Sequence, residues 1–115
     1  MAADDVGFSF ERAIASPSTT RITASMEKME KVDDTHVKLT LKYAYGPIEN
    51  CLANVNCSIV SQAAVEADPD GFSRNPVGTG PYKFVSWDSG SKISFTAHED
   101  YFRGVASITN LDYQI

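Results

Sequence analysis

Residues 75–82, Asn-Pro-Val-Gly-Thr-Gly-Pro-Tyr, constrain the fold of this chain more than any other stretch. Gly78 and Gly80 supply backbone freedom, including positive φ, that other residues reach only at a cost. Pro81 fixes its own φ and directs the preceding Gly80 toward extended geometry. A dinucleotide-binding fingerprint fits poorly, because its third glycine is missing and a strand pattern follows where a helix should begin. We therefore predict a rigid structural turn that launches a strand and is built from Gly78, Thr79, Gly80, Pro81 and Tyr82.

Alternation of apolar and polar residues predicts two β-hairpins. Val37, Leu39 and Leu41 share one face of a strand, and the Asp-Asp-Thr sequence at 33–35 supplies the turn before it. Tyr43 and Tyr45 are expected to continue this strand as far as the Gly-Pro break that follows. A second hairpin and a last strand are predicted over residues 82–87, 92–97 and 107–115.

The helical patterns are short. Val6, Phe10, Ala13 and Ile14 recur at helical spacing after two aspartates that suit a helix N-terminus, and Ser-Pro-Ser at 16–18 ends the pattern. Shorter helices are predicted after Pro47 and over residues 61–67, with an extended run at 55–60 between them. Residues 22–26 alternate, and the later break in phase predicts a bulge or a change of element near Lys28.

These elements predict an α+β fold of mostly antiparallel strands in hairpins, with two or three short helices, over residues 1–115. A length of 115 residues allows one small domain at most. A net charge of −5 argues against a nucleic-acid partner, which requires a basic face. The sequence holds no apolar run long enough to span a membrane and no basic-then-apolar leader.

Metal and thiol chemistry find little support in the sequence. His36 and His98 have no ligand partner at metal spacing, so we expect no metal site and two exposed histidines. Cys51 and Cys57 match neither Cys-x-x-Cys nor a zinc pattern. Free buried thiols are favoured, although an oxidising compartment would also allow a disulfide. No nucleophile elbow or other catalytic motif is present, and no cofactor is expected.

Several segments, in order along the chain, resemble the extracellular solute-binding proteins of ABC importers, family 5. Asp-Val-x-Phe-Ser-x-x-Arg at 5–12 resembles the helix of that family, and 33–42 resembles its central hairpin. The remaining matching segments are residues 75–82, 93–95, 100–104 and 108–113. The resemblance therefore covers nearly the whole chain.

This resemblance implies a piece of the first lobe of a periplasmic-binding-protein type II-like fold. It implies capture of oligopeptides, nickel chelates or oligosaccharides for ABC permease subunits, by a periplasmic protein or an extracellular lipoprotein that is not an enzyme. The segment at 53–58 resembles the stretch that faces the ligand in related importers. The expected ligand contacts are Asn54, Asn56, Ser58 and, among the aromatic residues, Tyr45. Tyr82, Phe84 and Trp87 are expected in the core instead.

The alternation of Leu111, Tyr113 and Ile115 continues to the last residue, as in an unfinished strand. Taken with the greater length of family members, this pattern leads us to expect a fragment of one lobe. Such a fragment would bind no peptide alone and would dimerise through its open surfaces. Two other classes stay open at this point: a self-contained acidic α+β interaction module, and a small enzyme that uses Cys51 or Cys57.

Overall fold

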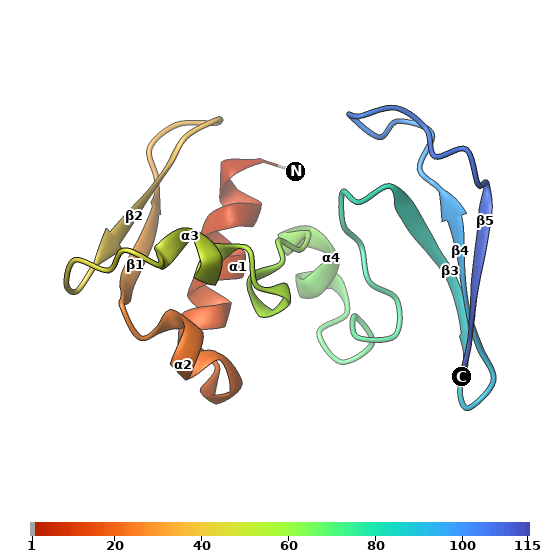
Figure 1. The fold of residues 1–115 in the computed structure, drawn as a ribbon, viewed down its shortest axis with the longest axis horizontal. Helices are drawn as coiled ribbons and strands as arrows, with labels where there is room; N and C mark the ends of the chain where they lie inside the picture. The colour runs from red at the N-terminus through yellow and green to blue at the C-terminus, as the bar shows by residue number, and fades with distance from the viewer. Residues whose placement is uncertain (1) are drawn as a thin grey trace. The chain divides into compact units, whose positions relative to one another are not determined.

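The computed structural model describes residues 2–115, which form two compact units divided between Gln62 and Ala63. Unit 1 holds most of the helices and unit 2 holds the larger sheet (Figure 1). The elements of unit 1 are α1 (Ala3–Ala15), the 3-10 turn η1 (Pro17–Thr19), α2 (Thr20–Thr23), β1 (Met26–Lys31), β2 (Val37–Leu41), α3 (Ile48–Leu52) and the 3-10 turn η2 (Val55–Cys57). The chain continues through α4 (Gln62–Ala67), β3 (Tyr82–Asp88), β4 (Lys92–Ala97) and β5 (Asn110–Gln114). The predicted α+β class is confirmed.

Helix α1 begins and ends where the sequence predicts. The Asp5 carboxylate accepts hydrogen bonds from the Ala2 N–H (2.7 Å) and from the Gln62 N–H (2.9 Å). It therefore satisfies one unpaired donor at the helix start and ties α1 to the far end of unit 1. At the other end the Ser16 N–H donates to the Ala13 carbonyl, and the chain becomes extended.

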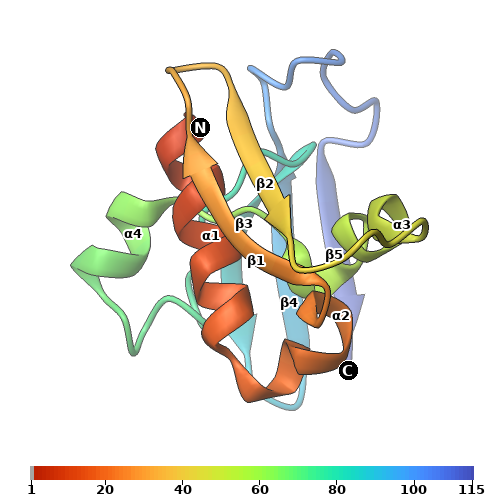
Figure 2. The same cartoon turned by 90° about the vertical axis from the view of Figure 1, so that its left-hand side faces the viewer.

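The β1–β2 hairpin packs against α1 (Figure 2). Its turn is held by Asp33, whose carboxylate accepts from the Thr35 N–H (2.8 Å) and the His36 N–H (2.9 Å). The register slips between Met26 and Lys28, which confirms the irregularity predicted near Lys28. The prediction that Tyr43 and Tyr45 continue the strand is wrong. Strand β1 begins at Met26, opposite the last residue of β2, so no facing strand remains beyond that point.

Unit 1 encloses its own hydrophobic core. Met26 and Met29 of β1 meet Phe10 of α1 and Cys57 of η2, and all four side chains are buried. Partly buried apolar residues surround this cluster: Val6, Ile14, Ile22, Leu39, Leu41, Ile48, Cys51, Leu52 and Ile59. The helical stripe of α1 and the apolar face of β2 therefore meet as their spacing predicts.

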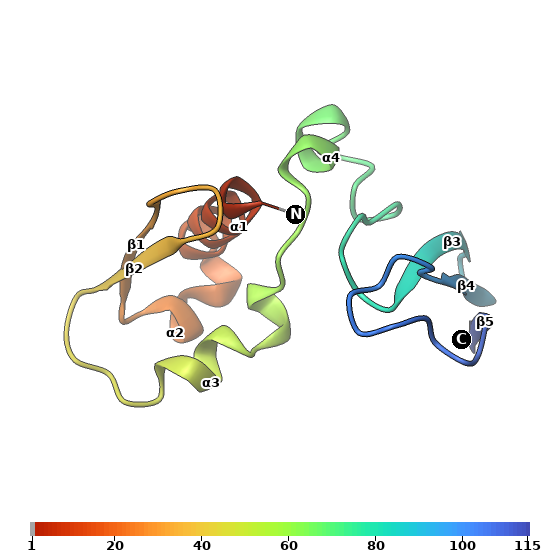
Figure 3. The same ribbon diagram turned by 90° about the horizontal axis from the view of Figure 1, so that it is seen from above.

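Unit 2 is built around an antiparallel sheet of strand order β3-β4-β5 (Figure 3). Phe84 faces Phe95 in the register, and Gly90 lies in the turn of the β3–β4 hairpin with a φ of 74°. The second predicted hairpin is confirmed. Strand β5 is shorter than the predicted 107–115, and its pairing with β4 begins only at Asn110.

Three local expectations are wrong. Residues 55–57 form a 3-10 turn rather than an extended run, because the Asn54 side chain caps it by accepting from the Asn56 N–H. Residues 20–23 form α2, a helix too short to show helical periodicity in the sequence. Trp87 lies outside the core with 38% of its surface exposed, since its ring packs under the guanidinium of Arg74 rather than under a second layer.

No helix within residues 2–115 has the length and apolar character needed to cross a membrane.

Candidate functional site

The expected ligand segment at 53–58 is a tight polar turn. The Asn54 side chain caps η2, and the Ser58 hydroxyl donates to the Val55 carbonyl (2.7 Å). These bonds fold the segment and leave the side-chain amide of Asn56 without a partner among the residues described. Asn54, Asn56 and Ser58 are all exposed. The turn therefore exposes the side-chain amide of Asn56, whose hydrogen-bonding groups are available to a ligand.

A hollow of about 210 Å³ lies beside this turn, and we call it the Arg12 hollow. It is lined by Ser9, Arg12, Ala13, Ser16, Ser18, Thr19, Asn56, Ser58 and Val60. Two of the four predicted ligand contacts, Asn56 and Ser58, are therefore brought together, while Asn54 and Tyr45 lie outside the lining. No carboxylate belongs to this lining.

Tyr45 lies instead on the connection between β2 and α3. Its ring meets that of Tyr43 edge-on, with centroids 6.2 Å apart, and 37% of its surface is exposed. This exposure leaves Tyr45 open to a contact from outside the unit, at a place separate from the Arg12 hollow.

Sequence reasoning missed the α1 side of the hollow. Ser9, Arg12, Ala13 and Ser16 follow the spacing i, i+3, i+4, i+7, which places them on one face of a helix. This spacing can be recognised in the sequence, but it indicates only a polar face of the helix and not what lies opposite that face. Val60 reaches the hollow because its N–H donates to the Ser9 hydroxyl (3.0 Å), which links the end of the turn to α1.

The glycine-proline motif lies in unit 2 and lines a second hollow of about 440 Å³. Positive φ is absent at Gly78 and Gly80, so the predicted use of that freedom is wrong; only Gly90 and Gly104 adopt it within residues 2–115. The motif is held by its neighbours instead. The His98 ring donates from Nδ1 to the Gly80 carbonyl (3.0 Å), and the Tyr82 hydroxyl donates to the Ile108 carbonyl (3.1 Å).

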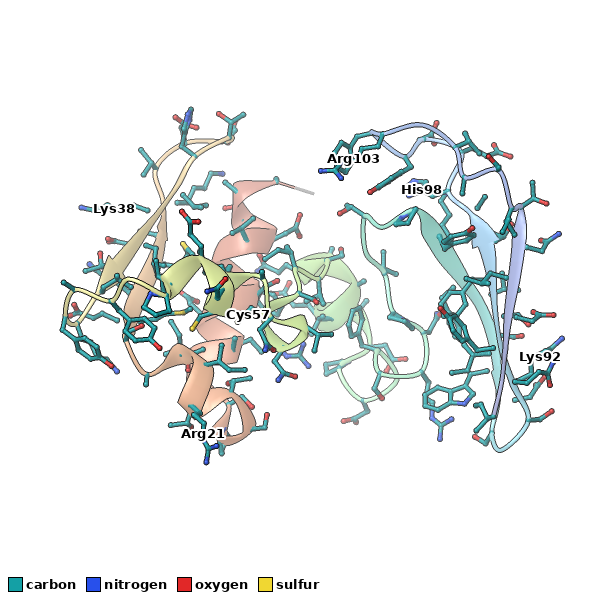
Figure 4. The ribbon with its side chains drawn as sticks, viewed as in Figure 1. Arg21, Lys38, Cys57, Lys92, His98 and Arg103 are labelled. Carbon is teal, nitrogen blue, oxygen red and sulfur yellow. The ribbon has the colours of Figure 1, made fainter. Side chains whose placement is uncertain are left out.

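The cysteines and histidines form no reactive cluster in the part of the chain that the structure describes. Both thiols are free, and Cys57 lies in the interior of unit 1 (Figure 4). Burial raises the pKa of the Cys57 thiol, and nearby Cys51 raises it further, so the reactive thiolate is disfavoured. His36 is exposed and pairs with Asp33, whereas His98 is half-buried, not exposed as expected. No group of three metal-ligating side chains occurs in residues 2–115.

Over residues 1–115 the chain matches the family of bacterial extracellular solute-binding proteins, family 5 Middle. The chain belongs to this family. Family 5 consists of solute-binding proteins rather than enzymes, which removes the cysteine-enzyme alternative.

Relatives of this family 5 chain are named for different solutes. It is 30% identical to the Di/tripeptide-binding protein 2 of Pseudomonas aeruginosa, over 95% of this chain and 24% of the relative. It is also 30% identical to the Heme-binding protein A of Haemophilus influenzae, over 95% of this chain and 23% of the relative. The chain thus spans about a quarter of the length of these relatives.

Solved structures agree with the family 5 fold. The binding protein MoaA from Agrobacterium tumefaciens R10, in complex with mannopinic acid, matches 100% of this chain and 24% of its own, with a TM-score of 0.93 and 30% identity. The periplasmic binding protein DppA from Helicobacter pylori, in complex with the peptide STSA, matches 98% of this chain and 26% of its own, with a TM-score of 0.88 and 26% identity. The predicted resemblance to a lobe of periplasmic binding proteins is therefore confirmed.

Proposed function

We propose that this chain is part of the first lobe of a protein that captures oligopeptides or related small solutes outside the cytoplasmic membrane and delivers them to ABC permease subunits. The observation that carries the proposal is the family 5 match over residues 1–115. Support for a peptide comes from the di/tripeptide-binding relative and from the peptide-bound neighbour. Two-lobed binding proteins close on a ligand by hinge motion, so one wall alone holds it poorly.

Within this function, Asn54, Asn56, Ser58 and Tyr45 are the proposed solute contacts of this lobe. All four are exposed. The amide of Asn56 is uncommitted, and the ring of Tyr45 offers an apolar wall with a polar tip, as ligand sites favour. Gly78, Thr79, Gly80, Pro81 and Tyr82 have a structural role instead, because they connect β3 to His98 and Ile108.

Titration calorimetry with a mixed oligopeptide pool tests both parts of this proposal. The full-length product of the gene that encodes this chain is expected to give saturable heats, and the 115-residue chain alone is expected to give none that saturate in the micromolar range. Micromolar binding by the chain alone would overturn its role as one wall of a closing pair. Absence of heats from the full-length product with peptides, heme and mannopinic acid, the solutes of the relatives and neighbours above, would overturn solute capture.

We further propose that the isolated chain dimerises through unit 2. Strand β5 pairs with β4 only and leaves a free edge, and Tyr113 and Ile115 beside that edge are 58% and 66% exposed. Free edges and exposed apolar side chains drive self-association. Light scattering should give the mass of a dimer at high concentration, and Tyr113→Lys should shift it toward monomer. A wild-type monomer at the highest soluble concentration would contradict the proposal.

A further inference from the structure

Arg12 is a basic residue that forms no ion pair within residues 2–115. Its guanidinium has no acidic partner among residues 2–115, whereas Lys28, Lys31 and Lys92 pair with carboxylates. Arg74 lies 4.0 Å from the ring centroid of Trp87 and also donates to the Ser89 hydroxyl. Lys31 pairs with Asp4 and Asp34. Arg12 instead lines a polar hollow that contains no carboxylate.

The hydroxyls around the hollow divide into committed and available donors. Ser9, Thr19 and Ser58 each donate to a backbone carbonyl: those of Asp5, Ala13 and Val55 respectively. Ser16 and Ser18 bond to each other at 2.9 Å, so only one of the two donates within the pair and the other has a free proton. The Asn56 amide also has its N–H donors unpaired within the described residues. Arg12, Asn56 and one serine are therefore the available donors.

We propose that the Arg12 hollow is a binding site for a small oxyanion, a carboxylate or a phosphate group. The planar fork of an arginine side chain matches the two oxygens of such a group, and the resulting charge-assisted bonds are stronger than neutral ones. The Asn56 amide and the free serine proton are further donors in the same lining that can complete the oxygen shell. The volume of about 210 Å³ admits the anionic end of a molecule rather than a whole peptide.

The molecule to which the anionic group belongs follows from the proposed function, and this part of the inference rests on that function. If the parent protein captures peptides, the occupant is a terminal or side-chain carboxylate. The site itself needs no second lobe, since all its donors belong to unit 1. An exposed arginine in a chain of net charge −5 binds weakly, so we expect an affinity on the order of 10 mM.

A nuclear magnetic resonance titration of the ¹⁵N-labelled 115-residue chain tests the site. Sodium acetate and sodium phosphate are added in separate arms, with sodium chloride holding the ionic strength constant. Saturable shifts are expected at the Asn56 side-chain amide, the Arg12 side-chain N–H and the backbone of residues 12–18. The anion with the lower dissociation constant shows whether the site prefers a carboxylate or a phosphate. Saturable binding of either anion supports the proposal.

Substitutions of Arg12 test whether this side chain binds the anion. Arg12→Gln should weaken binding about tenfold or more, and Arg12→Lys should weaken it less, because lysine keeps the charge but loses the fork. Arg21→Gln is the matched control and should bind as the wild type does, since Arg21 projects from α2 outside the hollow (Figure 4). Should Arg12→Gln melt below the wild type, Asn56→Asp replaces it, because a new carboxylate in the hollow should abolish binding.

Three results would overturn the site. The first is a wild-type response that stays linear or is scattered over the whole surface. The second is equal affinity in wild type and Arg12→Gln, or equal loss in Arg21→Gln. The third is an equal response to glycerol, which would indicate a hydroxyl-binding hollow with no preference for charge. None of these results depends on peptide capture, so the anion site and the proposed function fail separately.

Discussion

The two units of this chain bury their apolar residues to very different extents. Unit 1 places Phe10, Met26, Met29 and Cys57 in one buried cluster that is covered on several sides by partly buried residues. Unit 2 has only three buried apolar side chains, Val65, Phe72 and Ala97. Its sheet leaves Val85 57% exposed and Tyr113 58% exposed. A hydrophobic core therefore stabilises unit 1, whereas hydrogen bonds and contacts between aromatic rings contribute a larger share of the stability of unit 2.

The difference between the two units lies in how the sheet of unit 2 is packed. A three-stranded sheet becomes stable when one face packs against another layer. In unit 2 the aromatic rings pack mainly on one another, with Phe84–Phe95 and Phe95–Tyr113 centroids 6.1 and 5.9 Å apart. We infer that the fold of unit 2 depends more on an additional packing partner than the fold of unit 1 does.

The largest expected effect comes from truncating the core of unit 1. Met26 is fully buried, so Met26→Ala should cost about 2–5 kcal/mol of the free energy of unfolding. Phe95→Ala is the matched truncation in unit 2, and it should cost about 1 kcal/mol because its ring is only partly buried and contributes mainly aromatic pairs. Urea unfolding followed by circular dichroism measures both. Equal losses would contradict the contrast between the two units.

A glycine substitution in unit 2 should have a smaller effect. Gly90 adopts a φ of 74°, and an added Cβ would meet nothing within 4 Å, so Gly90→Ala carries only the backbone cost of about 1–2 kcal/mol. Gly80→Ala is the control. This glycine has no positive φ and its added Cβ also meets open space, so the change should lie within about 0.5 kcal/mol of neutral.

Thermal melts of both glycine variants at equal concentration provide the measurement. A loss at Gly80 as large as that at Gly90 would mean that the glycine-proline motif uses conformational freedom after all. It would also restore the prediction made from the sequence.

Local pattern predicted most elements of this fold. Alternation located both hairpins, and helical spacing located α1, because each pattern reports burial on one side of an element. The end of β2 could not be predicted in this way, since Tyr43 and Tyr45 keep the alternation and only the absence of a facing residue beyond Met26 ends the pairing. Pairing partners are tertiary information, which a single strand does not encode. The same holds for Trp87, whose partner Arg74 lies 13 positions earlier.

Two of the four expected ligand contacts line the Arg12 hollow, and their role stays a prediction. Asn56 and Ser58 of the hollow were among the expected ligand contacts, whereas Arg12 was assigned only to a helix and Ser16 to the end of that helix, because their meeting with the turn depends on a contact across unit 1. The bond between Val60 and Ser9 that closes this contact joins residues 51 positions apart. Spacing along a helix can show a polar face, but it cannot show what lies opposite that face.

The smallest expected effect concerns Asp5, which joins the start of α1 to the last residue of unit 1. Hydrogen bonds from the Gln62 N–H and then the Ala2 N–H lower the pKa of the Asp5 carboxyl. A lowered pKa means that the carboxylate stabilises the folded state above pH about 4, the value in an unfolded chain, and that this contribution disappears as the pH falls through the folded-state pKa. Asp5→Asn should therefore cost about 1 kcal/mol at pH 7.

The pH dependence separates this mechanism from a general loss of packing. The difference in unfolding free energy between wild type and Asp5→Asn should shrink toward zero as the pH falls from about 4 to about 2, because both side chains are then neutral. Glu11→Gln, at an exposed position on the same helix, should change little at either pH. A pH-independent difference for Asp5→Asn would show that the side chain acts through its shape. Unit 1 would then be closed by packing and by neutral hydrogen bonds such as that between Val60 and Ser9, without a charged contact between its two ends.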